Sequence, residues 1–203
     1  MSMPTLDHPI PNPIHTVKSA QPTIATLVLA FDADPIIRWT YPRQDRYLSC
    51  FPTLVTLLGQ AAFGAGTADR TPDGAGAALW VPPDSPQDDE ALVSLAVRSI
   101  DEDRHPVAFE FLEQVGEHHP TEPHWYLPFI GVDPVHQGRG IGSALLRRGL
   151  ARADADGLPT YLEASSPRNR ALYERHGFVV TGEIQTADSP PLWPMRREPQ
   201  GTQ

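Results

Sequence analysis

The spacing of apolar and polar residues predicts a chain in which helices and strands alternate. The clearest helix lies between Pro42 and Phe63, where apolar side chains recur every three or four positions. These apolar residues are Leu48, Phe51, Val55, Leu58 and Ala62. Gly64 and Gly66 are expected to end the helix, since glycine readily adopts the left-handed conformation found after a last helical turn.

The pattern is weaker upstream of this helix. Residues 1–13 contain four prolines and no periodic apolar pattern, so we expect a flexible tail. Residues 14–20 alternate well enough to predict a first strand, and Pro22 suits the first turn of a following helix. Residues 23–33 are ambiguous by themselves, because their β-branched side chains favour a strand locally.

Proline and glycine divide the middle of the chain. Pro72-Asp73-Gly74 is typical of a hairpin turn, and Pro82-Pro83 breaks the strand after it. The predicted elements here are strands at 67–70 and 75–81, then helices at 91–97 and 106–115 separated by the charged segment 101–104.

The last third of the chain has the strongest pattern. Residues 126–132 are mostly aliphatic or aromatic, as in a strand covered on both faces, and apolar residues then follow helical spacing from Ile141 to Gly157. Ser166-Pro167 predicts an N-cap and first turn for a later helix, which Gly177 ends. The remaining predicted elements are strands at 159–164, 178–182 and 192–196, with residues 199–203 frayed.

Three glycines open the helix at Ile141, in the sequence Gln137-Gly138-Arg139-Gly140-Ile141-Gly142. The first N–H groups of a helix have no partner within it, and glycines let phosphate oxygens approach them closely. Arg139 in the loop, and the helix residues Arg147, Arg148 and Arg152, add cationic donors. The loop is therefore expected to cradle a diphosphate.

Two other interpretations of this loop stay open on the residues alone. The glycines can serve only close packing, or Gly138-x-Gly140-x-x-Ser143 can belong to a dinucleotide-binding fold with Glu163 on a ribose. A five-residue segment between strand and glycines, and the short chain that remains after them, argue against the dinucleotide fold. A Walker loop is excluded because no Gly-Lys-Ser/Thr occurs.

Two motifs together resemble the GNAT acetyltransferase superfamily. Gln137-x-x-Gly140-x-Gly142 after a buried strand looks like its acetyl-CoA motif, and Asn169-x-x-x-Tyr173-x-x-x-Gly177-Phe178 looks like its later signature. Glu163-Ala164-Ser165 and the closing segment 192–195 are similar to the branch that contains puromycin N-acetyltransferase. The resemblance covers about the last 80 residues.

The resemblance implies a single α/β domain at 14–198, in which helices flank a central, mostly antiparallel twisted sheet, and it favours a helix at 23–33. It also implies acetyl-CoA as cosubstrate. The backbone of Ile130, Gly131 and Val132 would then hold pantetheine and polarise the thioester. The pyrophosphate would lie on Gln137, Gly138, Arg139, Gly140, Ile141 and Gly142, and Asn169 would bind the pantetheine arm.

Acetyl transfer to an amine needs a neutral amine, a stabilised oxyanion and a leaving thiolate that is protonated, and it needs no metal. The family resemblance makes Tyr173 the general acid, because a tyrosine hydroxyl is protonated at neutral pH. Glu163 or His124 is the candidate base, and a structural role for either stays open. The histidine-rich segment 117–124 has no recognised zinc spacing, so we expect a solvated loop.

Composition narrows the function further. A length of 203 residues with 40% hydrophobic content suits one globular domain, and a net charge of −9 argues against a nucleic-acid binder. The single cysteine, Cys50, is expected to pack in the core. The apolar run 24–31 is too short to span a bilayer and has no basic leader, so we expect a cytoplasmic protein without a membrane partner.

The resulting hypothesis is an N-acetyltransferase that moves an acetyl group from acetyl-CoA to a primary amine of a small molecule, by direct transfer in a ternary complex. A protein or peptide N-acetyltransferase and a non-catalytic acyl-CoA sensor are the alternatives. The sequence leaves a monomer and a homodimer equally open.

Overall fold

The computed structural model of the chain describes residues 14–16 and 19–201. The predicted tail at 1–13 lies outside the described residues, as do residues 17–18 of the predicted first strand and the last two residues of the predicted frayed end. Within that end, the backbone N–H of Gln200 donates to the Asp154 carboxylate at 2.7 Å.

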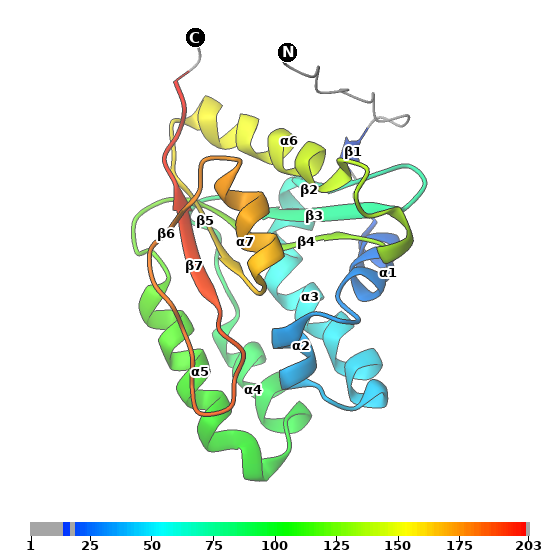
Figure 1. Cartoon of the computed structure of the whole chain (residues 1–203), viewed down its shortest axis with the longest axis vertical. Coiled ribbons are helices and arrows are strands. Elements are labelled where there is room, and N and C mark those ends of the chain that lie inside the picture. The colour runs from blue at the N-terminus through cyan, green and yellow to red at the C-terminus, as the bar shows by residue number, and fades with distance from the viewer. Residues whose placement is uncertain (1–13, 17–18, 202–203) are drawn as a thin grey trace, which may run out of the picture.

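A seven-stranded sheet forms the centre of the described chain, in the spatial order β1-β2-β3-β4-β5-β7-β6 (Figure 1). Neighbouring strands are antiparallel except for β4 and β5, which are parallel. The predicted mostly antiparallel sheet is therefore confirmed, and the topology does not suit a dinucleotide fold, which needs a parallel sheet. The strands are β1 (His15–Thr16), β2 (Ala68–Arg70), β3 (Gly76–Val81), β4 (Trp125–Val132), β5 (Thr160–Ala164), β6 (Val179–Val180) and β7 (Trp193–Arg197).

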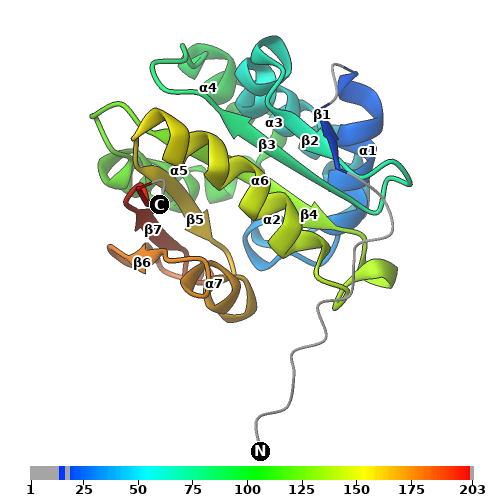
Figure 2. The same ribbon diagram turned by 90° about the horizontal axis from the view of Figure 1, so that it is seen from above.

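Helices cover both faces of the sheet. One core cluster joins α1 and α3 to β3 and β4, and a second joins α6 and α7 to the opposite face, as Figure 2 shows for α3 and α6. Cys50 packs at the edge of the first cluster. The helices are α1 (Ala20–Ala30), α2 (Pro35–Thr40), α3 (Gln44–Ala65), α4 (Asp89–Ser99), α5 (His105–His118), α6 (Ile141–Asp156) and α7 (Pro167–Glu174), with short 3₁₀ turns at Glu102–Arg104 and Pro134–His136.

The long helix α3 lies against the sheet through a stripe that differs from the predicted one at two positions, with Tyr47 in place of Leu48 and Gly59 in place of Leu58. Tyr47, Phe51, Val55 and Ala62 are fully buried, whereas Leu48 is 53% exposed. Gly59 completes the stripe, because a Cβ there would lie 2.4 Å from the Leu79 side chain. The helix is long and apolar enough to cross a membrane by length and composition alone, but its buried stripe is one wall of the core.

The structure differs from the predicted elements in three further places. Helix α2 was not predicted; Asp34 caps it by accepting the N–H groups of Ile36 and Ile37, and Pro35 occupies the first turn. Helix α5 continues through His118, so the predicted loop at 117–124 begins later. The strand predicted at 178–182 is reduced to β6, because only Val179 and Val180 pair with β7.

Two irregularities in β4 open the sheet where the site lies. Trp125 and Leu127 belong to the core cluster under α6, whereas Phe129 belongs to the cluster under α3, so the side-chain alternation slips between them. The pairing of β3 with β4 shifts register at this point, where Pro128 lacks an N–H. Strands β4 and β5 pair only at Trp125 and Tyr126, and they then diverge, with α7 in front of the gap (Figure 1).

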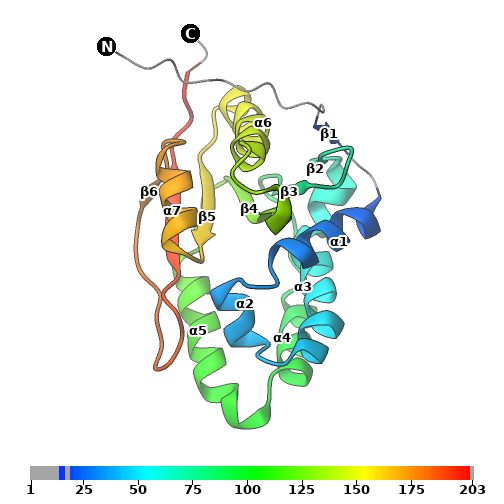
Figure 3. The same ribbon diagram turned by 45° about the vertical axis from the view of Figure 1, so that its right-hand side comes forward.

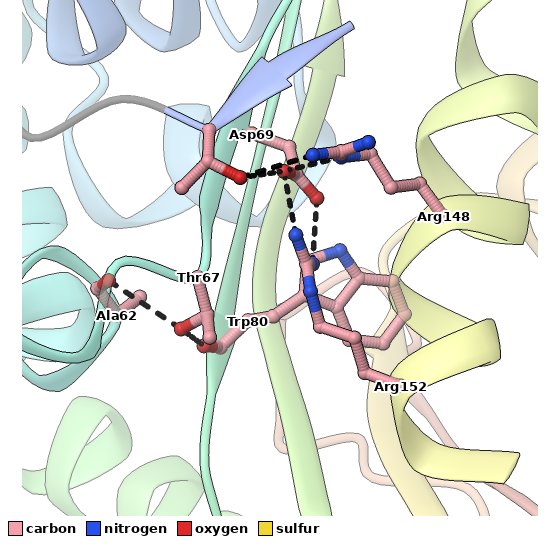
Figure 4. Close-up of polar contacts among 7 residues, drawn as sticks. Ala62, Thr67, Asp69, Trp80, Arg148 and Arg152 are labelled. Carbon is pink, nitrogen blue, oxygen red and sulfur yellow. Dashed lines mark hydrogen bonds and ion pairs between the residues drawn. The ribbon is translucent and has the colours of Figure 1, made fainter. Parts of the chain in front are cut away.

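Helix α6 is fixed to the hairpin β2–β3 by a buried charge. Asp69 is fully buried and accepts hydrogen bonds from Arg148 at 2.8 Å and Arg152 at 2.7 Å (Figure 4). These two arginines, four residues apart, therefore face the hairpin rather than a bound phosphate, which corrects their predicted role. On the same side Gly149 touches Trp80 so closely that a Cβ would lie 1.8 Å from the indole ring.

Candidate active site

A cavity of about 340 Å³ lies between the diverging end of β4, the start of α6, and α7. Every residue predicted to bind the cofactor lines it except Arg139, whose guanidinium faces Val135 and His136 on the surface. The lining residues from β4, from the turn and glycine loop after it, and from the start of α6 are Ile130, Gly131, Val132, His136, Gln137, Gly138, Gly140, Ile141, Gly142 and Ser143. Those at the end of α1, at the cap of α2, and in α7 with its C-cap are Ala30, Phe31, Asp34, Arg168, Asn169, Leu172, Tyr173 and Arg175.

The glycine loop forms one end of this cavity for local reasons. Gly138 and Gly140 have φ values of +76° and +79°, a region that side chains with a Cβ rarely adopt. The Gln137 amide links the end of β4 to α7, donating to the Val132 carbonyl at 3.1 Å and accepting from Arg168 at 2.8 Å. The backbone thus turns from β4 into α6 within a few residues.

The start of α6 presents free backbone donors to the cavity. The first helical hydrogen bond joins the Ala144 N–H to the Gly140 carbonyl at 3.0 Å, so the N–H groups of Ile141, Gly142 and Ser143 precede any helical partner. Arg168 and Arg175 line the same cavity and add positive charge. This donor set, at the positive end of a helix dipole, fits a diphosphate group.

Helix α7 supplies the predicted asparagine and tyrosine. The Ser166 side chain caps the helix by accepting from the Asn169 N–H, as predicted. Asn169 and Tyr173, one turn apart, both line the cavity. Tyr173 is 6% exposed, and burial, reinforced by the negative charges of Asp34 and Glu163, raises the pKa of its hydroxyl. The hydroxyl therefore remains protonated at neutral pH.

Asp34 is a lining residue that sequence reasoning missed. Its carboxylate caps α2 and also accepts a short hydrogen bond from the Ser165 hydroxyl, which in turn accepts from Asn169 at 3.4 Å. Burial raises the pKa of Asp34 despite these hydrogen bonds. The sequence Asp34-Pro35 could have indicated a helix N-cap followed by a first-turn proline. No local pattern indicated that the Asp34 side chain lies beside α7.

Glu163 lies on β5 and is not among the residues that line the cavity, but its charge acts on Tyr173, which does line it. Its Oε2 accepts from the Tyr126 hydroxyl at 3.1 Å, while its Oε1 is buried without a hydrogen-bond partner among the described residues. Burial raises the pKa of Glu163 to about 7, although the hydrogen bond from Tyr126 lowers it. A carboxyl group with that pKa exchanges protons readily at neutral pH.

His124, the other candidate base, does not line the cavity. Its Nε2 is 3.2 Å from Nε2 of His119, a residue that sequence reasoning passed over. The His119 ring then separates it from Glu163, with His119 Nδ1 4.0 Å from Glu163 Oε1. Burial, and secondarily His124, lower the pKa of His119 to about 4. No cluster of metal-ligating side chains occurs in residues 14–16 and 19–201.

Comparisons with known proteins agree with this geometry. The model of the acetyltransferase (GNAT) family matches residues 62–178. An uncharacterised N-acetyltransferase of Schizosaccharomyces pombe is 30% identical over 200 residues, which cover 90% of this chain and 81% of the relative.

Two solved structures are similar throughout. One is the structure of histone acetyltransferase HPA2 and related acetyltransferase from Corynebacterium glutamicum. It is 30% identical to this chain with a TM-score of 0.64, and the match covers 94% of this chain and 98% of the other. Arylalkylamine N-acetyltransferase 2 from Aedes aegypti has a TM-score of 0.69, covering 94% of this chain and 100% of the other. At 14% identity, the second likeness concerns the fold alone.

Proposed function

The chain belongs to the GNAT acetyltransferase family, and on this premise we propose that it transfers the acetyl group of acetyl-CoA to a primary amine of a small molecule. The observation that carries the proposal is the shared cavity, where the open edge of β4, the glycine loop and Tyr173 meet, with Glu163 close enough to Tyr173 for its charge to raise the tyrosine pKa. As in the family generally, acetyl-CoA supplies an activated acetyl thioester when bound.

The cavity lining suggests how the chain holds this cosubstrate. The N–H groups at the start of α6, with Arg168 and Arg175, suit its diphosphate. From Leu127 onward, the edge of β4 that faces β5 has no strand partner, which leaves backbone groups of Ile130 to Val132 for the amides of a pantetheine arm. Asn169 has an amide placed to bind the same arm.

Two groups divide the proton transfers in this proposal. Glu163 takes a proton from the acceptor ammonium, which must become a neutral amine before it attacks. Tyr173 donates from its hydroxyl to the departing thiolate. The raised pKa of both groups supports these roles, because Glu163 then exchanges protons near neutral pH while Tyr173 stays protonated.

Direct transfer in a ternary complex is part of the proposal. The single cysteine of the chain packs against the α1 and α3 cluster and does not line the cavity, so no thiol stands ready to carry the acetyl group. A cytoplasmic location, inferred from the sequence, is consistent with acetyl-CoA as the donor.

The acceptor is the least constrained part of the proposal. Helix α2 packs against α5 through Ile36 and Phe111, and Figure 3 shows both helices near the end of β5, the strand that carries Glu163. Among the similar proteins, one is an arylalkylamine N-acetyltransferase and another a histone acetyltransferase by name. Small amines, among them the aminonucleosides suggested by the puromycin-like motif, come first, and a protein amine is the alternative.

The test begins with thermal-shift titrations of the purified protein with acetyl-CoA, CoA and NAD, since a ligand that binds only the folded state raises its Tm. We expect both CoA compounds to stabilise it and NAD to leave Tm unchanged. A thiol-release assay with arylalkylamines, polyamines, aminonucleosides and lysine peptides then identifies the acceptor class. Stabilisation by CoA with no thiol release from any amine would support the sensor alternative and refute the enzyme.

A further inference from the structure

Two histidines extend from Glu163 toward the surface, in the segment that joins α5 to β4. These are His119 and His124. His119 packs against the sheet, with its ring centroid 4.9 Å from that of Tyr126 and 5.0 Å from that of Tyr161. The groups that face its ring are His124 in the same segment, Tyr126 on β4, and Tyr161 and Glu163 on β5. The His119 side chain is 32% exposed, whereas that of Glu163 is 10% exposed.

The hydrogen bonds of this segment fix which ring nitrogens carry protons. His124 Nδ1 is 2.7 Å from the Glu122 carbonyl oxygen, which only accepts, so this nitrogen must carry a hydrogen. In the neutral ring His124 Nε2 is then an acceptor, and His119 Nε2, 3.2 Å away, must donate to it. His119 Nδ1 is left with a free lone pair, and it faces Glu163 Oε1 at 4.0 Å.

The orientation is maintained from outside the pair. Arg196 on β7 makes a short ion pair with the Glu122 carboxylate, which fixes the residue whose carbonyl holds His124. In both histidines the ring N–H therefore points away from Glu163, and the ring lone pair faces back toward it.

We infer that Glu163, His119 and His124 form a proton relay, which carries the proton taken from the acceptor amine to solvent. The inference rests on the proposed acetyltransferase function, in which Glu163 is the base. His119 and His124 act through Glu163 and do not touch the substrate.

The protons balance through one turnover. Glu163 takes a proton from the ammonium and passes it to His119 Nδ1, while His119 Nε2 gives its own proton to His124 Nε2. The His124 imidazolium then releases one ring proton to water, and the partly exposed His119 regains its first tautomer by exchange with water. Glu163 is again a carboxylate. The second proton that the nitrogen loses as the amide forms restores the Tyr173 hydroxyl, which had protonated the thiolate, so one proton in total has left the site.

Distance and basicity both permit this route. The 4.0 Å gap exceeds a direct hydrogen bond by about 1 Å, which rotation about the broad terminal torsion of a glutamate covers. The pKa of His119, about 4, makes a protonated His119 roughly a thousandfold less populated than protonated Glu163, whose pKa is about 7. His119 therefore passes a proton onward rather than storing it.

The test measures whether a soluble base replaces the missing imidazole. Thiol release is followed at saturating acetyl-CoA and amine, in a dilute and bulky buffer, with rising concentrations of imidazole. For His119→Ala we expect kcat to fall by at least about tenfold, somewhat less than a direct acid or base contributes, and imidazole to restore it saturably. KM for acetyl-CoA should not change.

His118→Ala is the matched control, because His118 is the adjacent histidine and, among the described residues, its ring hydrogen-bonds only to the Gln114 carbonyl in its own helix. The control and the wild-type protein should be insensitive to imidazole. A folded His119→Ala protein with kcat within twofold of wild type, or with a loss that imidazole does not restore, overturns the relay alone. A wild-type protein inactive with every amine overturns the proposed function and the relay together.

A measurement on the wild-type protein covers the case in which His119→Ala does not fold. Nitrogen-15 NMR of the imidazoles distinguishes the two tautomers. We expect the hydrogen on Nε2 of His119 and on Nδ1 of His124. The opposite tautomer of His119 would remove the lone pair that faces Glu163 and refute the relay.

Discussion

Replacing Glu163 by Gln should make this protein more stable near neutral pH and less active. The buried carboxyl has a pKa of about 7, against 4.5 for an exposed glutamate, because ionisation inside the protein is opposed by burial. At about 1.36 kcal/mol per pKa unit, this difference amounts to about 3 kcal/mol of destabilisation once the group is ionised in both states. The neutral amide of Glu163→Gln has no such penalty.

The sign follows from which state holds the proton. Below pH 4.5 the carboxyl is protonated in both states, and its ionisation does not affect the free energy of unfolding. Between pH 4.5 and 7 the unfolded chain loses the proton first, so the wild-type protein is progressively destabilised relative to the variant. The difference should be near zero at pH 4.5, and reach about 3 kcal/mol at pH 8.

Urea unfolding of both proteins from pH 5 to pH 8 measures this difference, and common pH effects cancel between them. A hydrogen bond that the amide gains or loses changes the free energy of unfolding by the same amount at every pH. The test therefore depends on how the difference between the two proteins varies with pH. In parallel, thiol release by the wild-type protein should fall below pH 7, and the variant should lose about a hundredfold in kcat or more. A stability difference that does not vary with pH would refute the buried, proton-exchanging Glu163.

Other perturbations test separate parts of the structure. Tyr173→Phe should keep its fold and lower kcat by about a hundredfold, measured at saturating substrates; an unchanged kcat, with chemistry shown to limit the rate, would remove Tyr173 from the acid role. Asp69→Asn removes the buried charge between two arginines of α6 and should lower the free energy of unfolding by about 3 kcal/mol, measured in urea at pH 7. Gly149→Ala should lower it by at least about 2 kcal/mol, since its Cβ overlaps Trp80; a neutral effect would contradict this packing.

The sequence by itself determined the elements whose causes lie within a few residues. The stripe of apolar residues from Ile141, the glycines before it and the Ser166-Pro167 cap each correspond to an observed feature of α6 or α7. Their interactions join residues three or four positions apart, so spacing alone reveals them. The same holds for the hairpin turn around Asp73, where the Gly74 N–H donates to the Thr71 carbonyl and the Thr71 N–H donates to the Gly76 carbonyl.

Only the tertiary structure decided which side chains meet. Asp34 and Ser165 are 131 residues apart, and Arg152 and Asp69 are 83 apart, so no local pattern indicates that one pair borders the cavity and the other lies away from it. The proton affinity of Glu163 is likewise set by neighbours from β4 and β5 that exclude water from it. Local spacing specifies hydrogen bonds within an element, whereas burial and charge pairing arise when distant elements pack together.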